Sequence, residues 1–116
     1  MDIKEIQNRL EVFAVERDWN QFHNPKNLVM ALSVEASELV EIFQWLTPEA
    51  ALNLRNDPIK TSLASEEIAD ISLYLLRLAD KLGIDIESAI NSKLEKNAVK
   101  YPIEKSKGNA IKYSEL

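Results

Sequence analysis

Three dipeptides that pair a capping residue with proline divide this sequence into helical segments: Asn24-Pro25, Thr47-Pro48 and Asp57-Pro58. A capping side chain followed by proline is typical of a helix start, because the N–H that proline lacks is one that a first turn leaves unpaired. The chain has only two glycines and four prolines, too few for the many tight turns of a β-sandwich or barrel. The sequence therefore predicts an all-α fold.

Capping signals and apolar periodicity predict four main helices and one short helix. Asp2 caps the first, with Glu5 completing a capping box, and this helix is expected to run to about Trp19. The other expected helices cover residues 25–46, 48–54 (the short one), 58–82 (ended by Gly83) and 86–101 (capped by Asp85). We expect one domain, residues 1–102, forming an antiparallel four-helix bundle that is completed as a homodimer or homotetramer. Residues 103–116 are expected to be a lysine-rich tail with little regular structure.

Composition excludes several classes of protein. The absence of cysteine excludes disulfide frameworks and thiolate zinc sites. No apolar run approaches the roughly 20 residues that cross a bilayer, and no signal peptide opens the chain, so we expect no membrane association and a cytoplasmic location. A net charge of −5 makes duplex nucleic acid a poor partner. Gly83 and Gly108 stand alone, which excludes a glycine-rich phosphate loop.

Two carboxylates interrupt the apolar face of the second predicted helix. On a helical wheel its apolar residues form one narrow arc: Leu28, Leu32, Leu39, Ile42 and Leu46. Glu35 falls in the middle of this arc and Glu38 lies roughly 80° from its centre. Since burying an unpaired carboxylate costs several kcal/mol, this placement asks for a compensating group.

The long helix repeats the arrangement. Its expected apolar stripe is Ala64, Ile68, Ile71, Leu75, Leu78 and Leu82. Glu67 lies roughly 60° and Asp70 roughly 120° from the centre of this stripe, in a sector with Leu63 and Tyr74, whereas Glu66 points to solvent. Because residues three apart share a helical face, each helix would present one pair of carboxylates to the other.

Four facing carboxylates, Glu35, Glu38, Glu67 and Asp70, predict a site for a hard cation. Mg²⁺ fits an all-oxygen set best, with Mn²⁺ as a substitute. A di-iron site would need Glu-x-x-His on two helices, and the single histidine, His23, lies in a loop. The main alternative is a non-enzymatic helical interaction module in which the carboxylates pair with basic side chains: Arg17, Arg77, Lys81 and Lys93.

Basic and aromatic residues supply candidates for a nucleotide. Residues 93–116 carry six basic and three acidic side chains, against the acidic excess of the rest. Lys93, Asn97 and Tyr101 share one face of the last helix, flanked by Lys96 and Lys100, and could bind phosphates. Five aromatic side chains near the ends of the second helix could stack on a base: Trp19, Phe22, His23, Phe43 and Trp45. The alternatives are an exposed helix end and ordinary core or subunit contacts.

Together these segments resemble the MazG-like nucleotide pyrophosphohydrolases, and in particular their short single-domain branch. The matching blocks are Trp19-Asn-Gln-Phe-His-Asn-Pro-Lys-Asn-Leu28, Glu35-Ala-Ser-Glu38-Leu-Val-Glu-Ile-Phe-Gln-Trp45, Glu67-Ile-Ala-Asp70 and Lys96-Asn-Ala-Val-Lys-Tyr-Pro102. The resemblance covers roughly residues 5–113. It implies an all-α dimer or dimer of dimers, with sites where chains meet, that cleaves a nucleoside triphosphate between the α- and β-phosphates.

The resemblance also implies roles for individual residues. Mg²⁺ would be held by Glu35, Glu38, Glu67 and Asp70. Phosphates or sugar would meet Lys93, Asn97 and Tyr101, and the nucleotide pocket would be lined by Trp19, His23 and Trp45. The resemblance favours dCTP or a modified deoxynucleoside triphosphate as the substrate.

A mechanism follows as a hypothesis. Glu35 or Glu38 would take the proton of the attacking water, and Glu35, deepest in the apolar arc, has the pKa most easily raised. Lys93 and Lys96 would stabilise the leaving pyrophosphate, and Glu41 could support the acidic residues from one turn away. A phosphohydrolase that releases orthophosphate is a third reading, which product analysis would separate.

Overall fold

The computed structural model describes all residues, 1–116, and every regular element in it is helical, as predicted. The elements are α1 (Ile3–Glu16), α2 (Pro25–Phe43), α3 (Pro48–Asn53), the 3-10 turn η1 (Leu54–Asn56), α4 (Pro58–Lys81), α5 (Ile86–Lys100), α6 (Ile103–Ser106) and the 3-10 turn η2 (Tyr113–Glu115). The chain divides into two compact units, Met1–Gly83 and Ile84–Leu116. The boundary expected after Pro102 therefore lies inside the second unit.

The predicted capping residues begin their helices. Each accepts a hydrogen bond from a backbone N–H of the first turn, and they are Asp2, Asn24, Thr47, Asp57 and Asp85. Gly83 follows α4 with a φ of 65°, the left-handed conformation that glycine adopts without a steric penalty and that ends many helices. Local chemistry alone thus determines where these helices start and where α4 ends.

Two helices end earlier than predicted. The first was expected to reach about Trp19, but α1 ends at Glu16 because Asp18 has a φ of 55°, which a right-handed helix cannot contain. The second was expected to reach Leu46, but α2 ends at Phe43. Here the approach of Pro48 favours an extended conformation for Thr47, whose ψ is 161°.

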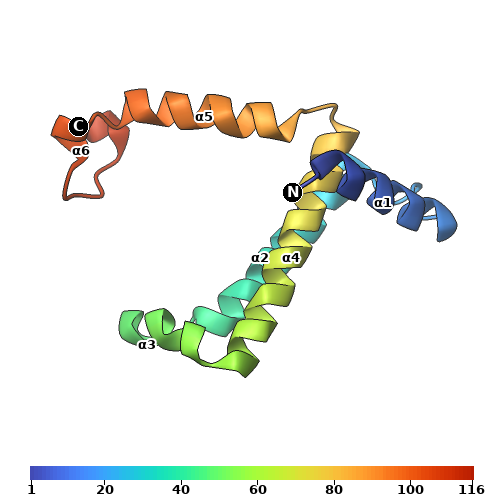
Figure 1. Cartoon of the computed structure of the whole chain (residues 1–116), viewed down its shortest axis with the longest axis horizontal. Coiled ribbons are helices and arrows are strands. Elements are labelled where there is room, and N and C mark those ends of the chain that lie inside the picture. Colours follow the sequence, from blue (N-terminus) through green and yellow to red (C-terminus); the bar gives the residue numbers. More distant parts are fainter. The chain divides into compact units, whose positions relative to one another are not determined.

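The first unit is organised around an antiparallel pair formed by α2 and α4, which α3 and η1 connect at one end (Figure 1). Leu28 of α2, only 2% exposed, is the most deeply buried apolar side chain of this pair. Near its C-terminal end, α4 also contacts α1, where Gln7 Nε2 donates a hydrogen bond to the Leu76 carbonyl at 2.9 Å. These contacts bring the acidic segments of α2 and α4 face to face.

The apolar stripe predicted for the long helix is only half covered, so the prediction of one buried stripe was wrong in part. Ala64 is buried and Ile71 and Leu78 are partly buried. Ile68, Leu75 and Leu82, which repeat every seven residues on the neighbouring line, are between 40% and 54% exposed. Within the first unit α2 and α1 cover one side of this stripe, which leaves the line of Ile68, Leu75 and Leu82 open.

The second unit has more regular structure than the predicted tail. After α5, the short helix α6 and the turn η2 fold back so that Tyr113 lies edge-on to Tyr101, with ring centroids 6.2 Å apart. The ammonium of Lys100 lies 4.7 Å from the centroid of the Tyr113 ring. None of the helices in the chain is both long enough and apolar enough to traverse a bilayer.

Candidate active site

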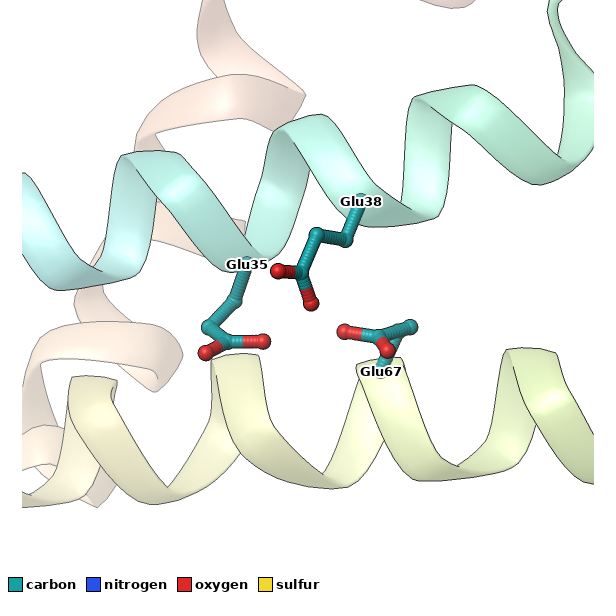
Figure 2. A group of neighbouring side chains, drawn as sticks. All are labelled: Glu35, Glu38 and Glu67. Atoms are coloured by element: carbon teal, nitrogen blue, oxygen red, sulfur yellow. The ribbon is translucent and has the colours of Figure 1, made fainter.

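Three of the four predicted metal ligands converge between the two long helices. Glu35 and Glu38 extend from α2 toward Glu67 on α4, and Figure 2 shows their carboxylates turned toward one another. One oxygen from each of the three lies within 4.8 Å of the other two. The antiparallel pairing of α2 and α4 therefore creates the acidic cluster that the spacing of the carboxylates predicted.

No basic side chain neutralises this cluster within the first unit. The ion pairs there join Arg77 and Lys81 to Glu11, and Arg17 to Glu16. One oxygen of Glu35 and one of Glu67 are buried without any hydrogen-bond partner. Buried polar atoms without partners are rare in proteins and call for a missing ion or water. The salt-bridged arrangement, with Arg17, Arg77 or Lys81 as the partner, is therefore not the one that forms.

Burial and the crowding of negative charge raise the pKa of two carboxyl groups in the cluster. Burial, with the neighbouring carboxyl groups of Glu35 and Glu38, raises the pKa of Glu67 to about 7. Burial is also the main cause that raises the pKa of Glu35, with a further contribution from the charge of Glu38. A cation placed among these oxygens would reverse both effects, because it stabilises the ionised carboxylates. The donor set thus fits a hard divalent ion.

Asp70 lies one helical turn beyond Glu67 but outside the group of three oxygens. Its side chain is exposed and lines an open cleft together with Glu35. Its charge contributes to the raised pKa of Glu35, which means that the two carboxylates interact electrostatically. Asp70 therefore lies where the acidic cluster meets the cleft.

This cleft, of about 720 Å³, joins the acidic cluster to the aromatic segment before α2. Its lining comes from α1, residues 17–24, α2 and α4: Ile6, Arg9, Leu10, Phe13, Trp19, His23, Glu35, Asp70, Leu73, Tyr74 and Arg77. The Trp19 ring lies edge-on to Phe13, with centroids 5.6 Å apart, and its centroid is 6.1 Å from that of His23. Trp19 and His23, both predicted to line a nucleotide pocket, thus lie in the same cleft as two of the predicted acidic ligands.

The remaining aromatic candidates lie elsewhere. Trp45 follows the end of α2, is 87% exposed and does not line the cleft. Phe22 is exposed as well, and Phe43 is partly buried at the end of α2. A single copy of the chain therefore brings together two of the five candidate aromatic side chains.

The predicted phosphate-binding residues are carried by α5 in the second unit. Lys93, Lys96 and Lys100 lie close enough that the neighbouring ammonium groups, that of Lys100 first, lower the pKa of Lys93. Asn97 lies on the same helix and is partly buried, and Tyr101 caps its end. The basic face predicted from the spacing is therefore formed within this unit.

Tyr74 and Arg77 are among the cleft residues that were not predicted to belong to a binding site. On the helical wheel Tyr74 lies in the same sector as Glu67 and Asp70. Its four-residue spacing from Asp70 could therefore have indicated that its side chain lies near the acidic residues. Burial raises the pKa of its hydroxyl, followed by the charges of Glu35 and Asp70. Arg77 was considered only as a possible partner of the carboxylates, and its actual partners come from segments far away in the sequence.

Comparison with known proteins identifies the fold and the family. A family model described as the MazG-like family matches residues 30–116. The chain is 39% identical to dCTP pyrophosphatase 1 of Bos taurus over 98% of its own length and 68% of that protein, and 37% identical to dCTP pyrophosphatase 1 of Homo sapiens, of which it covers 67%. A crystal structure of a pyrophosphatase from Archaeoglobus fulgidus DSM 4304 superposes with a TM-score of 0.80 at 38% identity, covering 88% of this chain and 94% of that one. The chain therefore belongs to the MazG-like family and is a nucleoside triphosphate pyrophosphohydrolase.

Proposed function

We propose that the substrate is dCTP or a closely related, including modified, deoxynucleoside triphosphate, which is cleaved to the monophosphate and pyrophosphate. The observation that best supports this substrate is the cleft, because Trp19 and His23 line it together with Glu35 and Asp70. Such a cleft can stack a base and lead its phosphates to a cation site. The names of the relatives, dCTP pyrophosphatases, favour cytosine as the base.

Mg²⁺, with Mn²⁺ as a substitute, is the proposed cofactor. Glu35, Glu38 and Glu67 would hold it, with Asp70 beside them, because a hard ion prefers carboxylate oxygens and two of these oxygens lack any other partner. When bound, the ion would neutralise the triphosphate and make the α-phosphorus more electrophilic.

Glu35 and Glu38 are the proposed catalytic residues. Proton transfer works best when the pKa of the base is near the working pH, and the pKa of Glu35 is shifted in that direction. Glu38 is exposed and lies next to Glu35, which lines the cleft, so its carboxylate is open to water at the acidic cluster. Stacking on Trp19 would orient the base, while Lys93, Lys96, Asn97 and Tyr101 would bind the phosphates or the sugar.

A homodimer, or a dimer of such dimers, is the proposed assembly. The open line of Ile68, Leu75 and Leu82 on α4 gives an apolar seam of heptad spacing, which is typical of helices that pack against a partner helix. The exposed Trp45 would be available to complete a nucleotide pocket once chains associate. We expect the enzyme to act in the cytoplasm, where nucleoside triphosphates are used.

The substrate proposal is tested by product analysis. The purified chain is incubated with each common deoxynucleoside triphosphate and with 5-modified cytosine forms, with Mg²⁺ or with EDTA, and pyrophosphate and orthophosphate are measured separately. We expect pyrophosphate from dCTP or its modified forms, dependent on the metal ion. Release of orthophosphate, or equal rates on all bases, would contradict the proposal.

A further inference from the structure

Arg77 is a buried charged side chain that is bound to the aromatic segment of the cleft. It is 2% exposed. Its Nη1 donates to Glu11 Oε2 on α1, its Nη2 donates to Asn20 Oδ1 at 2.6 Å, and its Nε donates to His23 Nδ1 at 3.2 Å. One guanidinium on α4 thus joins α1 to the loop that carries Trp19 and His23.

The partners of Arg77 are also bound to one another. Asn20 Nδ2 donates to Glu11 Oε1 at 3.0 Å, and Lys81 Nζ donates to Asn20 Oδ1 at 3.2 Å. A buried guanidinium is tolerated only when its charge and its donors are paired. The planar fork of arginine therefore has one favourable orientation here, and that orientation determines where His23 lies.

The bond from Arg77 also determines which nitrogen of His23 carries a proton. An arginine Nε–H can only donate, so His23 Nδ1 must be unprotonated in order to accept. In a neutral imidazole the proton then lies on Nε2. A second proton, on His23 Nδ1, would place its N–H group against the Nε–H of Arg77. It would also create a new cation beside Arg77 and Lys81. Glu11 is the one acidic group among the charges that act on the ring.

The electrostatic surroundings agree with this geometry. Burial, followed by the charges of Arg77 and Lys81, lowers the pKa of His23, and Glu11 offsets only part of this effect. The ring is therefore neutral at neutral pH.

We propose that Arg77 is a positioning residue that presents His23 to the cleft as a neutral hydrogen-bond donor through Nε2–H. The role of this donor in base recognition rests on the proposed function of the cleft. The ligand atom that meets His23 must then be an acceptor, such as the carbonyl oxygen or the unprotonated ring nitrogen on the pairing edge of cytosine. The preference of the enzyme among bases would thus depend on Arg77, although Arg77 binds His23 and not the base itself.

The tautomer can be observed without substrate or metal. His23 is the only histidine in the chain, so a spectrum of protein labelled with ¹⁵N-histidine reports on this ring alone. We expect a protonated Nε2 and an unprotonated Nδ1 at neutral pH, and a titration midpoint below that of free histidine. A protonated Nδ1, or two averaged nitrogens, would overturn the proposal even if the enzyme hydrolyses dCTP as expected.

Kinetics test the link to recognition. Arg77→Gln should raise the KM for dCTP about tenfold, because the base loses one hydrogen bond from the neutral His23 side chain. The value of kcat should change less than about twofold. Arg55→Gln, at an exposed arginine of η1, is the matched control and should leave both constants unchanged. In a His23→Ala background, Arg77→Gln should add little to the rise in KM. Independent, multiplicative effects of the two substitutions on KM would overturn the proposal.

The pH profile separates positioning from a merely structural role. In the parent protein KM should rise as pH falls through the lowered pKa of His23. In Arg77→Gln, which removes the adjacent cation, that rise should begin at a higher pH. A variant that is less folded would lose activity at every pH without moving the midpoint, and this result would count against the proposal. Should Arg77→Gln fail to fold, the ¹⁵N spectrum of the parent protein decides by itself.

Discussion

Replacing Glu38 by Gln should make the protein more stable without metal and inactive with it. Glu38 is exposed, and its polar neighbours in the cluster are the like-charged carboxylates of Glu35 and Glu67, so the substitution leaves no buried apolar contact behind. It removes one of three negative charges that lie within 4.8 Å of each other. It also removes a proposed metal ligand and catalytic base. Stability and activity are therefore expected to move in opposite directions, which no simple loss of folding could produce.

The size of the effect follows from the geometry. Two unit charges 4.8 Å apart repel by about 0.9 kcal/mol even in bulk water. Loss of the repulsion between Glu38 and Glu35 alone should then raise the melting temperature of this chain by about 4 °C, and relief of the Glu67 charge adds to it. Loss of a general base should lower kcat by at least about a hundredfold.

The assay is thermal unfolding at pH 8 and low ionic strength, in EDTA and in Mg²⁺, combined with pyrophosphate release. The pH lies above the pKa of Glu67, about 7, so this carboxyl group is mostly ionised. Glu66→Gln is the matched control, because Glu66 is exposed on the same helix as Glu67 and lies outside the cluster. A Glu38→Gln variant that melts below the parent protein in EDTA, or that retains near-normal Mg²⁺-dependent hydrolysis, would contradict a repulsive acidic cluster that binds the metal ion.

Three further outcomes are expected. In EDTA, the stability of the protein should fall as pH rises from about 4.5 to 7, because the raised pKa of Glu67 makes the native state bind more protons than the unfolded state in this range. Thermal melts between about pH 5 and 8 measure this trend, and saturating Mg²⁺ should remove it. Leu28→Ala should cost about 2 to 4 kcal/mol in urea unfolding, since the Leu28 side chain on α2 is almost fully buried. A cost below about 1 kcal/mol would show that the surroundings of Leu28 are loosely packed. Leu75→Glu should shift the assembly toward monomer in sedimentation experiments, because a charge in the open apolar line of α4 opposes the packing of a partner helix; an unchanged assembly would exclude this line as the interface.

Local chemistry made most of the helix boundaries predictable. A capping side chain and the following proline act within one turn, and all five predicted caps accept the expected hydrogen bonds. The two wrong ends, at Glu16 and Phe43, occur where a single backbone conformation ended the helix before its apolar pattern did. Periodicity continues through such a point, so it cannot locate it.

The acidic cluster was predictable because helical geometry is rigid over three residues. Spacing alone put Glu35 with Glu38 on one face, and the antiparallel pairing of two amphipathic helices placed Glu67 opposite them. The sequence could not separate Asp70 from this group, since the difference depends on how the side chains cross the space between α2 and α4. The sequence also could not predict that Ile68, Leu75 and Leu82 on α4 are exposed, because their burial depends on which helices pack against α4.

The sequence by itself thus determined the helices, their caps and the acidic pairs, all of which depend on interactions within a few residues. Tertiary structure decided that Arg77 binds Glu11, Asn20 and His23, side chains more than 50 residues away. It also decided that Trp19 and His23 share a cleft with the acidic cluster. Hydrogen bonds and packing between distant segments depend on the angle and register of whole helices, and no local pattern in a single sequence specifies those.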